Sequence, residues 1–88
     1  MSGYTLFVKL CTPLYFDHRD KFHQLKAAGE TFLHYTAYLW KHHNNRQKQI
    51  WSYRYFMYKN YPKKFAAAEI SDIQKEIMKL VNDLLIDS

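Results

Sequence analysis

Apolar side chains near the end of the chain recur three and four residues apart, and this spacing constrains the fold more than any other feature. The stripe is formed by Ile70, Ile73, Ile77, Leu80 and Leu84, and it is widened by Val81 and Leu85. Residues at these intervals share one face of an α-helix, so they predict an acidic, amphipathic last helix over residues 69–87. Ser71 and Gln74 fit a capping box, so the helix begins there or is entered from the alanines at 66–68.

A stripe of this length must be covered by another apolar surface. It faces either the core of a helical bundle or the same stripe of a second chain, in a homodimer through residues 70–85. Two heptads are too few to identify a coiled coil, so both arrangements stay open.

Two further helices are predicted in the middle of the chain, joined by a polar turn. Phe32–Lys41 carries aromatic and aliphatic side chains at helical spacing, and Thr31 precedes it as an N-cap residue. Arg46–Asn60 follows the turn at Asn44 and Asn45, because asparagine tolerates turn conformations. Pro62 ends this helix, since the residue before a proline is driven away from α geometry. The two segments therefore predict a helical hairpin.

The N-terminal part is less regular. Tyr4–Cys11 is nearly continuously apolar and is ambiguous between helix and strand, although the spacing of Thr5 and Lys9 favours a helix. Thr12–Pro13 then predicts the start of a helix over Leu14–Ala28, because proline suits the first helical position. Together the segments predict a single all-α domain over residues 1–88, a small antiparallel bundle of four to five short helices.

Aromatic residues are unusually frequent for so short a chain. The 88 residues include eight Tyr, six Phe and two Trp, and the apolar content is 48%. A chain of this size holds one core and buries only about 60–65% of its unfolded surface. That core cannot cover sixteen rings completely, so we expect some of them to be exposed for contact with a partner.

The net charge of +5 is distributed unevenly along the chain. Residues 31–68, which we call the basic-aromatic segment, hold seven Lys or Arg and no Asp or Glu, whereas residues 69–88 total −3. Such asymmetry indicates association with an anionic partner. Buried rings beneath a solvated basic rim would produce the same pattern.

A surface that alternates cations with rings suits nucleic acid, because phosphates attract cations and unpaired bases stack on flat rings. The candidate phosphate ligands are Arg46, Lys48, Arg54, Lys59, Lys63 and Lys64. The candidate stacking or interface residues are Trp51, Tyr55 and Tyr58. The leading hypothesis is a small non-enzymatic protein that binds DNA or RNA through backbone and stacking contacts.

The same residue types are enriched at the centres of protein interfaces. The alternative function is therefore a protein-binding module, either a small accessory subunit or an inhibitor that docks on a larger complex. Membrane contact is not expected, because Arg46–Lys59 does not separate an apolar face from a basic one. No apolar run is long enough to span a bilayer.

Little in the chain predicts catalysis. None of the five histidines forms the i, i+4 pair of zinc-binding helices, and two glycines cannot build a phosphate-binding loop. We therefore expect no catalytic residues, no metal and no cofactor. Cys11 is the single cysteine, which predicts a cytoplasmic or other intracellular reducing compartment. Residues 1–10 lack the basic start of a signal peptide, so we expect none.

Overall fold

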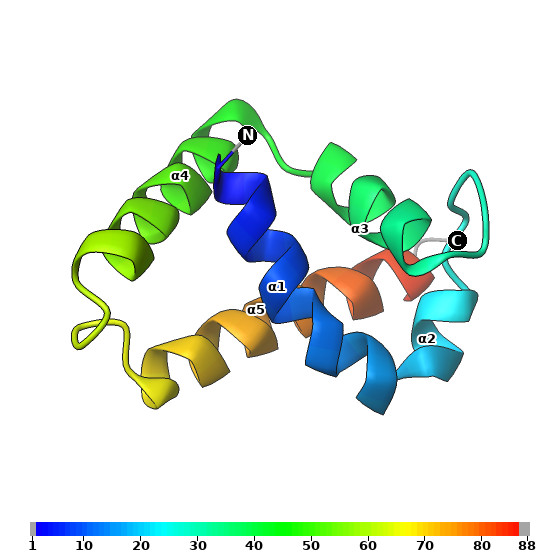
Figure 1. Ribbon diagram of the computed structural model, residues 1–88. Coiled ribbons are helices and arrows are strands. Elements are labelled where there is room, and N and C mark those ends of the chain that lie inside the picture. The colour runs from blue at the N-terminus through cyan, green and yellow to red at the C-terminus, as the bar shows by residue number, and fades with distance from the viewer. Residues whose placement is uncertain (1, 87–88) are drawn as a thin grey trace.

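The computed structural model describes residues 2–86 and contains five helices and no strands within them (Figure 1). The helices are α1 (Ser2–Asp17), α2 (Arg19–His23), α3 (Phe32–Lys41), α4 (Asn45–Asn60) and α5 (Ala67–Ile86). The predicted small all-α bundle is confirmed. The two ends of the predicted domain and residue 87 of the predicted last helix lie outside the described residues.

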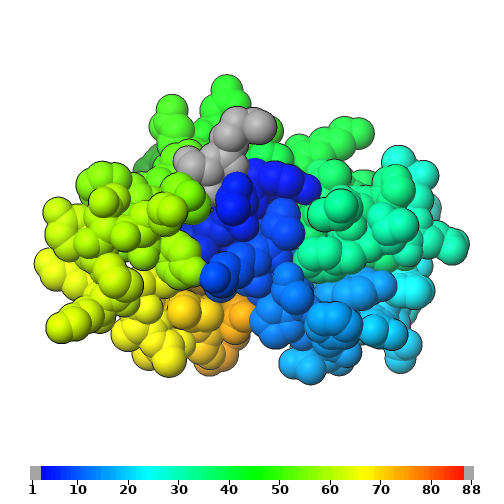
Figure 2. Space-filling view, in the orientation of Figure 1, coloured from blue at the N-terminus to red at the C-terminus, as the bar shows by residue number. Residues whose placement is uncertain are grey.

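Helix α1 is the centre of the molecule and packs against each of the other four helices, most extensively against α4. It runs through the middle in Figure 1, and in Figure 2 its surface separates α4 from α2 and α3. Its buried side chains are Leu6, Phe7, Leu10, Cys11 and Leu14. The ambiguous segment 4–11 is therefore helical, and its nearly continuous apolar pattern reflects burial against several neighbours.

The predicted helix start at Thr12–Pro13 is wrong, because Pro13 lies inside α1. A proline within a helix has no N–H to donate to the preceding turn. Two side chains bind backbone carbonyls around this point: Thr12 Oγ1 donates to Val8 O at 3.0 Å, and Gln74 Nε2 donates to Leu10 O at 3.2 Å. Burial of α1 on both sides of Pro13 outweighs the local cost of the proline.

The predicted helix over Leu14–Ala28 is also interrupted. The chain leaves the helical path at His18, forms the short α2, and is non-helical over residues 24–31. Leu25 turns back into the core in this connection, where it is buried. Leu14 of α1, Phe22 of α2 and Leu25 of the connection thus face the same core without belonging to one helix.

A close approach of two backbones joins α1 to α4. Gly3 is buried, and a Cβ atom at this position would lie 2.8 Å from the backbone nitrogen of Ser52 and 2.9 Å from the carbonyl carbon of Trp51. Real Cβ atoms do not approach backbone atoms so closely. The missing side chain of Gly3 therefore sets the distance between the two helices.

Helices α3 and α4 have the predicted caps and the predicted turn between them, but they diverge from that turn and pack on α1 rather than on each other, so the predicted helical hairpin is wrong (Figure 1). The side chain of Thr31 accepts a hydrogen bond from the His34 backbone N–H at 3.3 Å, and α3 has the predicted bounds. Asn44 and Gln47 form a reciprocal capping box in which both hydrogen bonds measure 2.8 Å. Helix α4 begins one residue before the predicted start and ends at Asn60, ahead of Pro62.

Helix α5 begins at Ala67, so it is entered from the alanine run and Ser71 lies within it. Ile73, Ile77 and Val81 of its apolar stripe are buried, and the other members of the stripe pack against the same core. The stripe therefore serves the protein's own core, and a homodimer through residues 70–85 stays a prediction. None of the helices between residues 2 and 86 has the length and apolar character needed to cross a membrane.

Candidate nucleic-acid interface

Helix α4 carries aromatic side chains on two sides, and Trp51 marks the side that faces inward. Trp51 is 1% exposed. The edge of its ring meets Phe7 with 5.1 Å between centroids, and the Arg54 guanidinium covers it at 4.7 Å from the centroid. The prediction that Trp51 stacks on a partner is therefore wrong. The largest apolar side chain of α4 fills the α1–α4 contact because burial there removes the greatest apolar area from water.

Tyr55 and Tyr58 lie on the same side of α4 as Trp51, and both are half-buried against the core. Lys59 Nζ lies 5.9 Å from the centroid of the Tyr55 ring. The Tyr58 hydroxyl accepts a hydrogen bond from Lys9 Nζ, and its ring packs edge-on against Phe65 at 5.8 Å. Contacts within the protein thus cover part of each ring, and their role as stacking or interface residues stays a prediction.

The opposite side of α4 and the turn after it expose three other rings. Tyr53 is 64% exposed, Phe56 is 51% exposed and Tyr61 is 48% exposed. The ring centroids of Phe56 and Tyr61 are 6.1 Å apart. The sequence prediction named Trp51 as an outward ring and did not include these three residues. Polar neighbours would have indicated it, since Tyr53 and Phe56 share their side of the helix with Gln49 and Asn60 at helical spacing.

Four of the six predicted cations are exposed on α4 or in the turn after it. Arg46 lies on the same side of α4 as Tyr53, seven residues or about 10 Å earlier along the axis. Lys59, Lys63 and Lys64 follow at the end of α4 and in the turn to α5, and all three are exposed. Lys64 Nζ lies 5.7 Å from the centroid of the Tyr61 ring.

We call this surface the α4 outer face. It consists of Arg46, Tyr53, Phe56, Lys59, Tyr61, Lys63 and Lys64. The sequence prediction of cations beside exposed rings therefore has a counterpart in the structure, but with rings other than the predicted ones.

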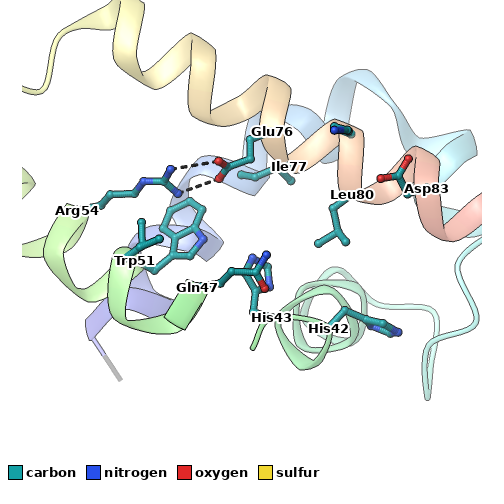
Figure 3. Close-up of a pocket in the computed structure, with 11 residues that line it drawn as sticks. His42, His43, Gln47, Trp51, Arg54, Glu76, Ile77, Leu80 and Asp83 are labelled. Atoms are coloured by element: carbon teal, nitrogen blue, oxygen red, sulfur yellow. Dashed lines mark hydrogen bonds and ion pairs between the residues drawn. The ribbon is translucent and has the colours of Figure 1, made fainter. Parts of the chain in front are cut away.

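The two remaining cations are engaged inside the protein. Lys48 is half-buried, and its Nζ lies 5.9 Å from the centroid of the Trp40 ring. Arg54 forms a two-point ion pair with Glu76 of α5, with Nη1–Oε2 at 2.9 Å and Nη2–Oε1 at 3.3 Å (Figure 3). Its planar fork is occupied by a carboxylate and its face by Trp51. We therefore remove Arg54 from the phosphate ligands and assign it to holding α4 against α5.

A cleft of about 290 Å³ lies beside this ion pair, between the turn that joins α3 to α4 and the middle of α5 (Figure 3). Arg54 and Lys79 balance Glu76 and Asp83 along its walls, so the cleft has no dominant charge. Such a lining does not favour a polyanion.

His43 also lines this cleft and is half-buried. Its Nδ1–H donates to Leu39 O at 2.9 Å, which fixes the position of that proton because a carbonyl can only accept. Burial lowers the pKa of His43 below its ordinary value, although the Leu39 carbonyl and the charge of Glu76 act in the opposite direction. Burial therefore disfavours the protonated imidazole.

A second groove, of about 410 Å³, separates the later part of α4 from the first turns of α5. It is lined by Tyr53, Arg54, Met57, Lys64, Phe65, Glu69, Asp72 and Ile73. Two of these residues, Tyr53 and Lys64, also belong to the α4 outer face. The groove is therefore continuous with the candidate interface, and we call it the α4–α5 groove.

The described residues contain no group of three or more His, Cys, Asp or Glu side chains that could hold a metal ion. Cys11 is fully buried, and burial raises the pKa of its thiol far above the ordinary value. It packs as a small apolar residue in the core, in an environment that opposes thiolate chemistry.

Comparison with protein-family models, with curated proteins and with solved structures finds no match to this chain.

Proposed function

We propose that this protein binds single-stranded nucleic acid through the α4 outer face and catalyses no reaction. The observation that supports the proposal is that three exposed rings and four exposed cations lie on α4 and the turn after it. The basic-aromatic segment contributes all seven residues and contains no Asp or Glu.

The rings supply the first kind of contact. Tyr53 and Phe56 are three residues apart, which places them on one side of the helix with an axial separation of about 4.5 Å. An exposed ring on a convex helix can stack on a base only if the base is unpaired, since the bases of a duplex cover one another. Stacking of this kind is worth about 1–3 kcal/mol per base and depends little on sequence.

The cations supply the second kind of contact. Arg46 lies towards one end of the ring pair, while Lys59, Lys63 and Lys64 lie towards the other end. A strand that crosses Tyr53 and Phe56 therefore meets positive charge on both sides. Each phosphate neutralised on a single strand contributes roughly −0.7 to the slope of log K against log salt concentration.

Fluorescence anisotropy with a labelled oligonucleotide, single-stranded or annealed to its complement, tests this function. We expect the single strand to bind at least about tenfold more tightly than the duplex, because only unpaired bases offer a face for stacking. The double variant Tyr53→Ala, Phe56→Ala should lose about thirtyfold or more in single-strand affinity, because it removes two stacking contacts.

Phe16→Ala is the matched control. Phe16 is 61% exposed on α1, with the Arg19 guanidinium 5.2 Å from its ring centroid, and it lies outside the α4 outer face. Its removal should leave binding unchanged. Equal affinity of wild-type protein for duplex and single strand, or equal losses in the ring variant and this control, would refute the proposal.

One observation favours a protein partner as the second candidate function. The α4–α5 groove joins an apolar floor to charges of both signs, which is common in protein interfaces and unusual in nucleic-acid surfaces. A protein-binding module would use the same exposed rings as anchors. Its affinity should depend only weakly on salt, whereas the affinity for nucleic acid should fall steeply.

A further inference from the structure

We propose that the α4–α5 groove receives one base of the bound strand and prefers bases that carry an exocyclic amino group, namely cytosine, adenine and guanine. This inference rests on the proposed function, because it assigns a specificity to the strand that the α4 outer face binds.

The groove has the size and lining of a site for a flat, partly polar ring. Its volume of about 410 Å³ falls within the range of small-molecule sites, roughly 300–1,000 Å³. Met57, Phe65 and Ile73 provide an apolar floor, of which Phe65 and Ile73 are buried. Tyr53 stands at the rim with most of its ring exposed. The faces of a base that enters the groove would therefore be shielded from water, while its edge would stay near polar groups.

The α4–α5 groove adjoins the α4 outer face, so a strand bound to that face can reach the groove. Tyr53 borders the groove and is also one of the two rings on which the strand is proposed to stack. Lys64 lines the groove as well, and its exposed ammonium group can meet the phosphate of the nucleotide whose base enters. A strand that follows the outer face therefore passes the mouth of the groove.

The carboxylates of Glu69 and Asp72 decide which base edge the groove accepts. They are three residues apart on α5, so they share one side of the helix, and both are exposed. No ion pair or side-chain hydrogen bond involves either of them within residues 2–86. Ionised carboxylates accept hydrogen bonds and cannot donate them. The groove thus offers two acceptors beside a stacking ring.

The bases differ in the groups that they can present to these two carboxylates. Cytosine N4 and adenine N6 are amino groups that donate to a carboxylate, and guanine carries the N2 amino group. Thymine and uracil instead present a carbonyl oxygen on each side of a single ring N–H, and these oxygens are repelled by the carboxylates. The acids would oppose binding if they faced phosphates, so their placement inside the groove suits the edge of a base.

Competition of unlabelled oligo(dC), oligo(dA) and oligo(dT) of equal length against one labelled strand, at neutral pH and fixed salt, tests the inference. We expect oligo(dC) and oligo(dA) to bind about fivefold to tenfold more tightly than oligo(dT), the order of magnitude of one good contact to a base edge. The variant Glu69→Gln, Asp72→Asn should abolish this preference, mainly by strengthening the binding of oligo(dT).

Asp83→Asn is the matched control, because Asp83 is exposed on α5 but lines the other cleft, and it should retain the preference. Equal binding of the three oligonucleotides with a steep salt dependence would overturn the base preference and leave the proposed function standing. A preference that survives in the amide variant would also overturn it. Failure of all three to bind would overturn both proposals.

Discussion

Replacing Arg54 by alanine should destabilise the fold while leaving the salt dependence of nucleic-acid binding almost unchanged. The substitution removes the ion pair with Glu76 that joins α4 to α5, and it uncovers the buried ring of Trp51. Arg46→Ala is the matched comparison, since Arg46 lies on the same helix but is exposed on the α4 outer face. It should show the opposite pattern, with unchanged stability and a weaker salt dependence.

The expected loss of stability in Arg54→Ala follows from the contacts of Arg54 with Glu76 and Trp51. The Arg54 side chain is 20% exposed and that of Glu76 is 58% exposed, so solvent screens the ion pair and it contributes about 0.5–1 kcal/mol. The contact of the guanidinium with Trp51 at 4.7 Å adds roughly 0.5–1 kcal/mol. Arg54→Ala should therefore cost about 1–2 kcal/mol, which lowers the Tm of a domain of this size by roughly 5–15 °C.

Urea unfolding of the wild type, Arg54→Ala, Glu76→Ala and the double variant measures the interaction directly. The coupling energy from this cycle should be about 0.5–1 kcal/mol. Anisotropy titrations over a range of salt concentrations give the second readout. Strictly additive losses of stability, together with a salt slope that Arg54→Ala reduces by roughly 0.7 as a lost phosphate ligand would, would refute the assignment of Arg54 to the fold.

Two further predictions concern the packing around α1. Gly3→Ala should destabilise the protein by about 1–2 kcal/mol in urea unfolding, because the new methyl group collides with the α4 backbone. This collision outweighs the better helix propensity of alanine. An unchanged or higher stability would contradict the close approach of α1 and α4. His43 has a lowered pKa in the folded protein, so its contribution to stability is present above about pH 6.5 and is lost as the pH falls below that value. His43→Gln should therefore flatten the decline in urea midpoint between pH 7.5 and 5.5, and an identical decline in both proteins would contradict the burial of a neutral imidazole.

Much of the fold could be predicted because local signals and burial agree. Thr31 caps α3, Asn44 caps α4 together with Gln47 in its first turn, and Pro62 follows the end of α4. The position of Pro13 within a helix could not be predicted from local signals in the same way. Its position inside α1 is decided by packing on both sides of the helix, and a proline at the first position of a helix has the same local appearance as one within it.

The candidate site was predicted only in part, for a related reason. The cations of the basic-aromatic segment indicate an anionic partner wherever they lie, but rings serve equally well in a core and on a surface. Helix α4 has aromatic residues on both sides, and the choice between them depends on which side α1 covers. Trp51 is drawn inward by its area and by the gap that Gly3 leaves, so Tyr53 and Phe56 face outward.

The α4–α5 groove was beyond the reach of sequence reasoning. It joins residues of α4 to Glu69 and Asp72 of α5, which lie more than a dozen positions further along the chain than Tyr53. Their proximity depends on the turn after Asn60 and on the way both helices pack on α1. The acidic character of the last helix was visible in the sequence, whereas its position beside an exposed ring was not.

The salt dependence of single-strand binding tests the central claim most directly. With four exposed cations on the outer face, the wild type should give a log–log slope of about −3, and the variant Lys59→Gln, Lys63→Gln, Lys64→Gln should give about −1. The control variant Lys26→Gln, Lys41→Gln, which alters exposed lysines elsewhere, should keep most of the wild-type slope. A wild-type slope near zero, or equal slopes for the triple variant and the wild type, would contradict a nucleic-acid interface on α4.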